Sequence, residues 1–172
     1  MSTRQFLQTS ADARNSVREL LQTIFATELV VPSRCLWIVS PWLRDVPVLD
    51  NATGDFLSLC PEFPRSEVRL SRVLRELLNR GTQVVIATRP DSGNRQVLDG
   101  LGDARRGGGL VLHERGDLHA KGVVGDLYSL IGSMNLTYNG IEHLTEMLVF
   151  ETDRSRVEGL RLAFRSEYGG AA

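Results

Sequence analysis

The sequence has few of the features that mark secreted or membrane-embedded proteins. Cysteine occurs twice among 172 residues, as Cys35 and Cys60, which is too few for a disulfide framework. No stretch approaches the ~18 consecutive apolar residues of a membrane-spanning helix, and the N-terminal segment lacks the apolar core of a signal peptide. We therefore expect a cytoplasmic protein with reduced cysteines and no membrane partner.

An excess of charge of either sign is also lacking. Twenty basic residues oppose twenty-one acidic ones, so the formal net charge is −1. No global field draws such a protein toward nucleic acid or anionic lipid, and contact with a polyanion must come from a local patch. The three histidines and two cysteines show no metal-ligand spacing, and we expect neither a metal nor another cofactor.

The sequence does contain a series of apolar segments whose spacing is typical of helices and strands. The predicted helices cover about residues 10–29, 68–78, 92–101 and 153–168, and the predicted strands cover 35–40, 83–87, 110–112, 118–124, 127–132 and 147–150. Residues 43–65 contain several prolines and are expected to be mostly irregular. Helices and strands alternate early and strands cluster late, which predicts an α/β fold with a mixed β-sheet flanked by helices. We expect a single domain over residues 1–172.

Polar residues interrupt two of the late apolar strands. His119 and Lys121 are two positions apart and would share one face of a strand, and the same holds for Ser133 and Asn135. Burying such groups is costly unless they are paired or used. An imidazole, a fixed cation, a hydroxyl and an amide donor on one surface suit a phosphoryl group.

The relative position of these residues depends on the turn at Gly125-Asp126. A two-residue loop at 125 and 126 places His119 opposite Gly132, with Ser133 on the other face. A three-residue loop that includes Leu127, or one bulge, pairs His119 with Ser133. We predict the longer loop or the bulge.

The spacing of these residues resembles the HKD motif of the phospholipase D superfamily. The resemblance rests on His119-x-Lys121, Asp126 and Gly132-Ser133-x-Asn135, and it extends over about residues 113–152. Five residues separate Asp126 from Gly132, where members of the family usually have six. Ser40-Pro41-Trp42 after the first predicted strand is a second, looser resemblance.

The resemblance implies a phospholipase D-like fold and a metal-independent double displacement at phosphorus. His119 would be the nucleophile, Lys121 and Asn135 would bind nonbridging oxygens, and Ser133 would add a hydrogen bond. Glu146 lies where the family carries an acidic residue that orients a histidine. Asp126 is interpreted as a structural turn residue.

A second histidine must protonate the leaving oxygen in this reaction. The chain has one HKD motif, and similar single-motif nucleases imply a homodimer in which two His119 residues meet across a two-fold axis. The alternative is a partner within the chain, for which His113 and His143 are the candidates.

The substrate is less constrained than the chemistry. We expect a nuclease that acts on DNA, with Arg44 as a further substrate contact; the alternatives are a phospholipid hydrolase or transphosphatidylase, and a catalytically silent nucleic-acid-binding subunit. The predicted N-terminal helix, the strand segment RCLWIVSPW (residues 34–42) and the turn Thr88-Arg89-Pro90 also resemble phospholipase D-like proteins encoded with 7-deazaguanine DNA-modification clusters. That resemblance implies partner proteins from a DNA-modification or defence system. Trp37 and Trp42 beside the first strand are more typical of core residues than of stacking platforms, and neither is assigned to the site.

Overall fold

The apolar runs of the sequence form one mixed sheet. The computed structural model describes residues 3–171. The strands of the main sheet are β1 Thr3–Leu7, β2 Cys35–Val39, β5 Gln83–Thr88, β6 Leu110–Glu114, β7 Gly122–Val124, β8 Ser129–Gly132 and β9 Met147–Glu151. Their order is β1-β9-β8-β7-β2-β5-β6, in which β2, β5 and β6 are parallel and the other neighbours are antiparallel. The predicted mixed sheet flanked by helices is confirmed.

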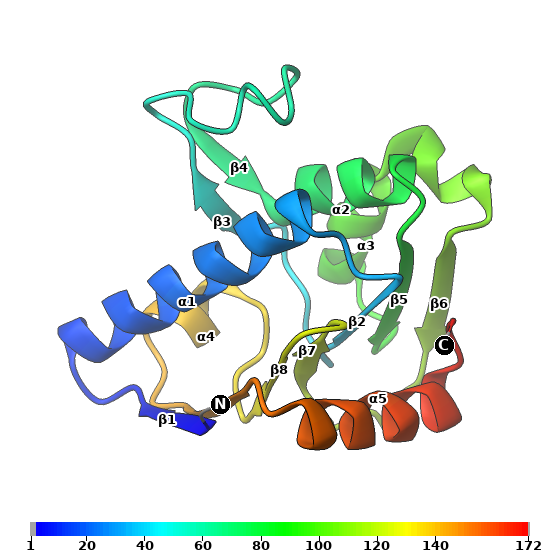
Figure 1. The fold of residues 1–172 in the computed structure, drawn as a ribbon. Helices are drawn as coiled ribbons and strands as arrows, with labels where there is room; N and C mark the ends of the chain where they lie inside the picture. Colours follow the sequence, from blue (N-terminus) through cyan, green and yellow to red (C-terminus); the bar gives the residue numbers. More distant parts are fainter. Residues whose placement is uncertain (1–2, 172) are drawn as a thin grey trace.

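Helices cover both faces of this sheet, as Figure 1 shows. They are α1 Ala11–Val30, α2 Leu70–Asn79, α3 Ser92–Gly100, α4 Tyr138–Glu142, α5 Arg154–Tyr168 and a 3-10 helix, η1 Gly102–Gly107. Helices α1, α2 and α3 lie on one face and α5 lies on the other. None of the helices in the described part of the chain combines the length and hydropathy of a bilayer-spanning segment.

Each face of the sheet has its own apolar core. The larger core joins α1 and α2 to the sheet through fully buried side chains such as Phe25, Ile38 and Leu74. The smaller core lies under α5 and contains Trp37 and Tyr168. Residues of β2 therefore alternate between the two cores, which explains why all five of them are buried.

The strongly periodic helices begin and end near their predicted positions. The Ser10 hydroxyl accepts a hydrogen bond from the Ala13 N–H (3.2 Å) at the start of α1. The Asp153 carboxylate caps α5 in the same way through the Arg156 N–H (3.2 Å). Gly169 ends α5 with φ +70°, a value that glycine adopts readily.

The first strand, β1, was not predicted. Its side chains are mostly exposed because it lies at the edge of the sheet, and it therefore shows no apolar alternation. The Glu151 carboxylate fixes it by accepting a hydrogen bond from the Thr3 hydroxyl (2.5 Å). This bond, together with that from the Asp153 N–H, lowers the pKa of Glu151 to about 2.

The segment predicted to be mostly irregular, residues 43–65, includes one strand that was not predicted. It contains β3 Pro47–Asp50, which pairs with β4 Glu67–Arg69 in a separate two-stranded sheet that projects from the body of the molecule (Figure 1). Asn51 is fully buried at the base of the intervening loop, where its amide donates to the Pro64 carbonyl (2.8 Å) and accepts from the Phe56 N–H (2.9 Å). These hydrogen bonds of Asn51 order the loop. The proline-rich composition of the segment gave no indication of them.

The β7–β8 hairpin differs from the prediction. The register pairs Gly122 with Ile131, Val123 with Leu130 and Val124 with Ser129, and the Gly125 N–H donates to the Tyr128 carbonyl (3.0 Å). The turn residues are therefore Asp126 and Leu127. The predicted pairing of His119 with Ser133 is wrong, because extending this register would place Met134 opposite His119.

Two physical reasons account for this difference. A side chain at Gly125 would place its Cβ 2.7 Å from side-chain oxygens of both Glu28 and Ser33, so glycine is needed there for close packing and not for the turn. In addition, β2 ends at Val39, opposite Gly122. Residues 119–121 therefore have no strand to pair with on that side, and the predicted strand 118–124 begins only at Gly122.

A buried polar network anchors the hairpin turn at the end of β7. The Ser33 N–H and hydroxyl both donate to the buried Glu28 carboxylate (2.9 and 2.7 Å), and the Asp126 N–H donates to the Ser33 hydroxyl (2.8 Å). The Asp126 carboxylate pairs with Arg161 of α5 (2.7 Å) and with Arg34 (3.1 Å). These contacts fit the structural turn role expected for Asp126.

Candidate active site

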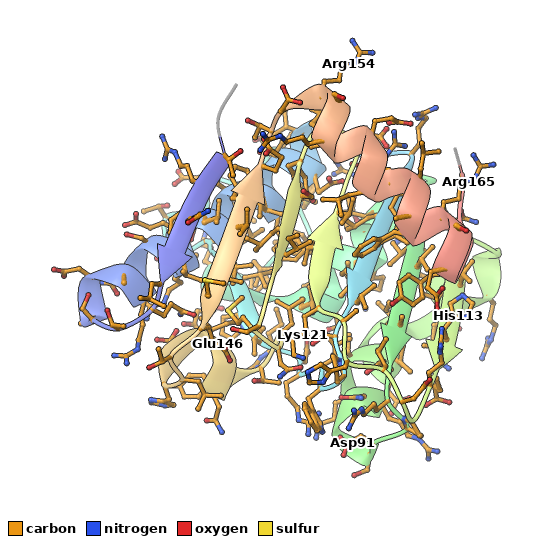
Figure 2. All side chains as sticks on the ribbon, turned by 90° about the horizontal axis from the view of Figure 1, so that it is seen from below. Asp91, His113, Lys121, Glu146, Arg154 and Arg165 are labelled. Carbon is orange, nitrogen blue, oxygen red and sulfur yellow. The ribbon has the colours of Figure 1, made fainter. Side chains whose placement is uncertain are left out.

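The predicted site residues gather at one edge of the main sheet. Because β7 is antiparallel to both β2 and β8, and β9 is antiparallel to β8, the ends of β2 and β8 lie beside the beginnings of β7 and β9. His119 and Lys121 precede β7, Ser133 and Asn135 follow β8, and Glu146 precedes β9. Figure 2 shows Lys121 and Glu146 at this edge.

Lys121 is held against the backbone of the predicted nucleophile. Its ammonium donates a hydrogen bond to the His119 carbonyl (2.7 Å), and the His119 side chain is exposed. Partial burial is the main cause that lowers the pKa of Lys121; the positive charge of Arg89 lowers it further, while the Glu146 carboxylate acts in the opposite direction. The ammonium therefore lies in the combined field of a second cation and an acidic residue.

Ser133 and Glu146 form the most tightly connected pair of the site. The Ser133 hydroxyl donates to the Glu146 carboxylate and accepts from the Met147 N–H (3.0 Å). Glu146 is buried, with 7% of its surface exposed. The family resemblance implies that this carboxylate orients a histidine, whereas its hydrogen-bond partner within the chain is Ser133. Its predicted role toward a histidine stays a prediction.

Gly132 makes this contact possible. An added Cβ at Gly132 would lie 2.1 Å from the Met147 carbonyl oxygen, so β8 and β9 approach more closely here than any side chain allows. The approach lets the Ser133 N–H donate to the same carbonyl (3.0 Å). The glycine of the motif therefore sets the distance between Ser133 and the strand that follows Glu146.

Asn135 lines a surface groove at the same edge of the sheet as the other predicted site residues. Its side-chain oxygen is 3.5 Å from the Trp42 N–H, and its backbone packs against Gly140 of α4, where an added Cβ would lie 2.3 Å from the Asn135 carbonyl. Helix α4 was not predicted, and it begins with the Thr137 hydroxyl accepting from the Gly140 N–H (3.0 Å). The groove has a volume of about 410 Å³ and is lined by Trp42, Arg44, Asn135, Thr137, Tyr138, Asn139 and Leu144.

Arg44 is close to the site but engaged by protein groups. Its guanidinium contacts the Asp91 carboxylate (3.0 Å) and the Asn94 side-chain oxygen (2.8 Å), and Asn94 is buried. Asp91 is labelled below Lys121 in Figure 2. The proposed substrate contact of Arg44 stays a prediction. It would require the guanidinium to bind the substrate while it keeps its ion pair with Asp91.

Three further residues of this edge were not assigned from the sequence. The Ser40 hydroxyl donates to the Trp42 carbonyl (2.7 Å) and accepts from the Leu136 N–H (3.1 Å), so it joins the end of β2 to the segment after Asn135. Trp42 is 40% exposed, contrary to the core position typical of such a residue. Arg89 lies 5.1 Å from the Trp42 ring centre and donates through Nε to the Leu118 carbonyl (2.8 Å).

The sequence does contain an indication that Arg89 lies at this edge. It comes directly after β5, whose carboxyl end lies at the same edge as that of its parallel neighbour β2. The tripeptide Ser40-Pro41-Trp42 marks that edge at β2. Recognising Arg89 therefore requires knowing that β2 and β5 are parallel neighbours.

Of the two other histidines, His113 lies away from the site edge and His143 lies beside the groove. His113 is on β6, separated from β7 by β2 and β5, and its Nε2 lies 2.7 Å from the Tyr168 carbonyl; Figure 2 shows it well away from Lys121. His143 packs its ring against Tyr138, with 5.2 Å between the ring centres. Within residues 3–171 neither histidine contacts the predicted nucleophile, and no cluster of three or more His, Cys, Asp or Glu residues could hold a metal ion.

Comparison with known protein families gives a match over more than half of the chain. A family described as "Cardiolipin synthase, PLD-like domain" matches residues 46–167. A comparison with curated protein sequences gives no match.

Solved structures share the fold at low sequence identity. NucT from Helicobacter pylori is 14% identical, with a TM-score of 0.63 over 96% of this chain and 94% of its own. Nuc from Salmonella typhimurium, a phospholipase D family member, is 12% identical, with a TM-score of 0.59 over 96% and 92%. Phosphatidylserine synthase from Haemophilus influenzae is 20% identical, with a TM-score of 0.57 over 96% of this chain but 38% of its own.

Proposed function

The chain belongs to the phospholipase D-like family, and on this premise we propose that it is a metal-independent phosphodiesterase that cleaves DNA through a phosphohistidine on His119. The observation that carries the proposal is the convergence of one histidine, one lysine, a serine–glutamate pair and an asparagine at one edge of the sheet. Family membership supports a phosphodiesterase-type enzyme, and the substrate and the residue roles are the proposed part.

The proposed reaction has two displacements. In the first, a ring nitrogen of His119 attacks phosphorus, the bond from phosphorus to the leaving oxygen breaks, and a second histidine donates a proton to that oxygen. In the second, the now neutral second histidine takes a proton from water, the resulting hydroxide attacks phosphorus, and the phosphorus–nitrogen bond breaks. Lys121 and Asn135 would stabilise the charge on the nonbridging oxygens, and Ser133, held by Glu146, would add a hydrogen bond.

The second histidine is proposed to be His119 of another copy of the chain. Apolar side chains surround the site edge, where Leu7 (57% exposed) pairs with Met147 (58% exposed) across β1 and β9 and Leu144 (50% exposed) borders the groove. A two-fold contact across this edge would bury these side chains and bring the two exposed histidines together.

DNA is the proposed substrate because the structures named NucT and Nuc match this chain over more than nine-tenths of both lengths. The likeness to phosphatidylserine synthase keeps a phospholipid hydrolase or transphosphatidylase as the second candidate. A catalytically silent subunit, and a role in a DNA-modification or defence system with partner proteins, stay predictions.

The test is a cleavage assay in EDTA on duplex DNA, single-stranded DNA, RNA and phosphatidylcholine vesicles. Wild-type protein should cleave DNA, and His119→Ala should reduce the rate by more than about 10⁴-fold. In the proposed dimer it removes both the nucleophile and the histidine that protonates the leaving oxygen, and the latter alone accounts for about 10²- to 10⁴-fold. His113→Ala should retain wild-type activity, since His113 lies on another part of the sheet. Cleavage that is unaffected by His119→Ala, or cleavage of lipid alone, would contradict the proposal.

A further inference from the structure

Arg89 is a cation of the site edge to which the proposed reaction assigns no role. It follows β5, whereas Lys121 precedes β7, and β2 lies between these strands. Their backbones are therefore two strand spacings apart, about 10 Å. The positive charge of Arg89 nevertheless lowers the pKa of Lys121, so the two cations form one positively charged edge that an extended polyanion could follow.

The guanidinium of Arg89 is fixed by two contacts. Its Nε donates to the carbonyl of Leu118, the residue before His119, and its Cζ lies over the Trp42 ring, 5.1 Å from the ring centre. Within residues 3–171 its two terminal nitrogens donate no hydrogen bond to the protein. An arginine held in this way loses little side-chain freedom when it binds an anion, and it offers two parallel donors that match phosphate oxygens.

The surroundings indicate where such an anion would lie. Trp42 carries Arg89 and also lines the groove that contains Asn135. Arg89 itself does not line the groove, and Trp42 is the residue that contacts both Asn135 and Arg89. A chain molecule whose reacting phosphate sits at Lys121 and Asn135 could therefore place its next phosphate beside Trp42, at Arg89.

We propose that Arg89 binds a phosphate of the DNA strand that flanks the one being cleaved, and that Trp42 is a positioning residue that holds the guanidinium in place. The proposal rests on the proposed function, because it requires a polynucleotide at the HKD site. It adds a second phosphate-binding position to that function. A substrate with a single phosphodiester would leave this position empty.

The test measures binding separately from cleavage. A fluorescein-labelled single-stranded DNA oligonucleotide is titrated in EDTA with the His119→Ala protein, alone or combined with Arg89→Ala, Arg89→Lys, Trp42→Ala or Arg154→Ala, at several salt concentrations. Arg154 is the matched control, since it is exposed at the start of α5 and points away from the site edge in Figure 2.

Arg89→Ala should weaken binding by about tenfold, the size of one charge-assisted contact. It should also reduce the slope of log affinity against log salt by about 0.7, the value for one phosphate contact on a single strand. Arg89→Lys should restore the slope, Trp42→Ala should weaken binding with the slope kept, and Arg154→Ala should change neither quantity.

A slope that Arg89→Ala leaves unchanged would overturn the proposal, because it would mean that Arg89 only supports the Leu118 carbonyl. Absence of oligonucleotide binding would overturn it as well. The cleavage assay of wild-type protein is read independently, so a protein that binds DNA through Arg89 without cutting it would refute the proposed reaction and leave the subsite standing.

Discussion

At the scale of single residues, Gly132 shows how one missing side chain shapes the site. The Met147 carbonyl occupies the space that a Cβ would take, at 2.1 Å. We predict that Gly132→Ala lowers the free energy of unfolding by about 1–3 kcal/mol, because β8 and β9 must separate to admit the methyl group. Urea unfolding followed by circular dichroism measures this change.

Gly159 provides the control for that measurement. It lies inside α5, and an added Cβ would meet nothing within 4 Å. Gly159→Ala should raise the free energy of unfolding by about 0.5–1 kcal/mol, since alanine favours the helix. Equal effects of the two substitutions would show that the close approach of β8 to β9 does not constrain position 132.

The sequence predicts that the site residues lie together better than it predicts the contacts that they make. His119 and Lys121 are two positions apart and so share one face of a strand. Together with the spacing from both to Ser133 and Asn135, this predicts one surface that binds phosphate. Sequence alone does not show that Glu146 accepts from Ser133, because that bond depends on the pairing of β8 with β9. Arg89 requires the strand order in the same way.

At the scale of elements, the network under the β7–β8 turn couples hairpin stability to pH. Burial raises the pKa of Glu28, and the hydrogen bonds from Ser33 oppose that effect in part. The stabilising contribution of a neutral Glu28 is therefore present below the ordinary pKa of about 4.5 and is lost as pH rises through the raised value.

We predict that Glu28→Gln makes stability less dependent on pH, because an amide fills the same space without a charge to bury. The melting temperature of wild type should fall from pH 4 to pH 8 by more than that of the variant. Glu19→Gln, on the exposed side of α1, is the control and should follow wild type. Parallel profiles for wild type and Glu28→Gln would contradict this account of the buried carboxyl.

Helices and strands with regularly spaced apolar residues were predicted well. Elements whose position depends on a few polar contacts were not. The α1 stripe and the β2 and β5 runs bury their apolar side chains as their pattern indicates. The hairpin register was wrong because Gly125 serves packing against Glu28 and Ser33 and not the turn. A glycine that forms a turn and a glycine that permits close packing look the same beside a short apolar run, so the sequence does not distinguish these two roles.

At the scale of the whole molecule, the proposed dimer makes activity depend on both chains. If each site needs two His119 residues, a dimer of one wild-type and one His119→Ala chain has no complete site. Mixtures refolded together at equal amounts should then show about one quarter of wild-type activity, because only that fraction of dimers has two intact chains. Activity close to one half would mean that each chain carries a complete site.

The pairing of β1 with β9 has a consequence for folding kinetics. Ser133 acquires its partner only when the segment from Glu146 to Met147 is in place, and β9 pairs on its other side with β1, whose Thr3 bonds to a residue 148 positions later in the chain. Contacts between such distant positions form slowly, because the entropy of closing the loop between them must be overcome first. The local helices and the β7–β8 hairpin are therefore expected to form before this edge of the sheet is assembled.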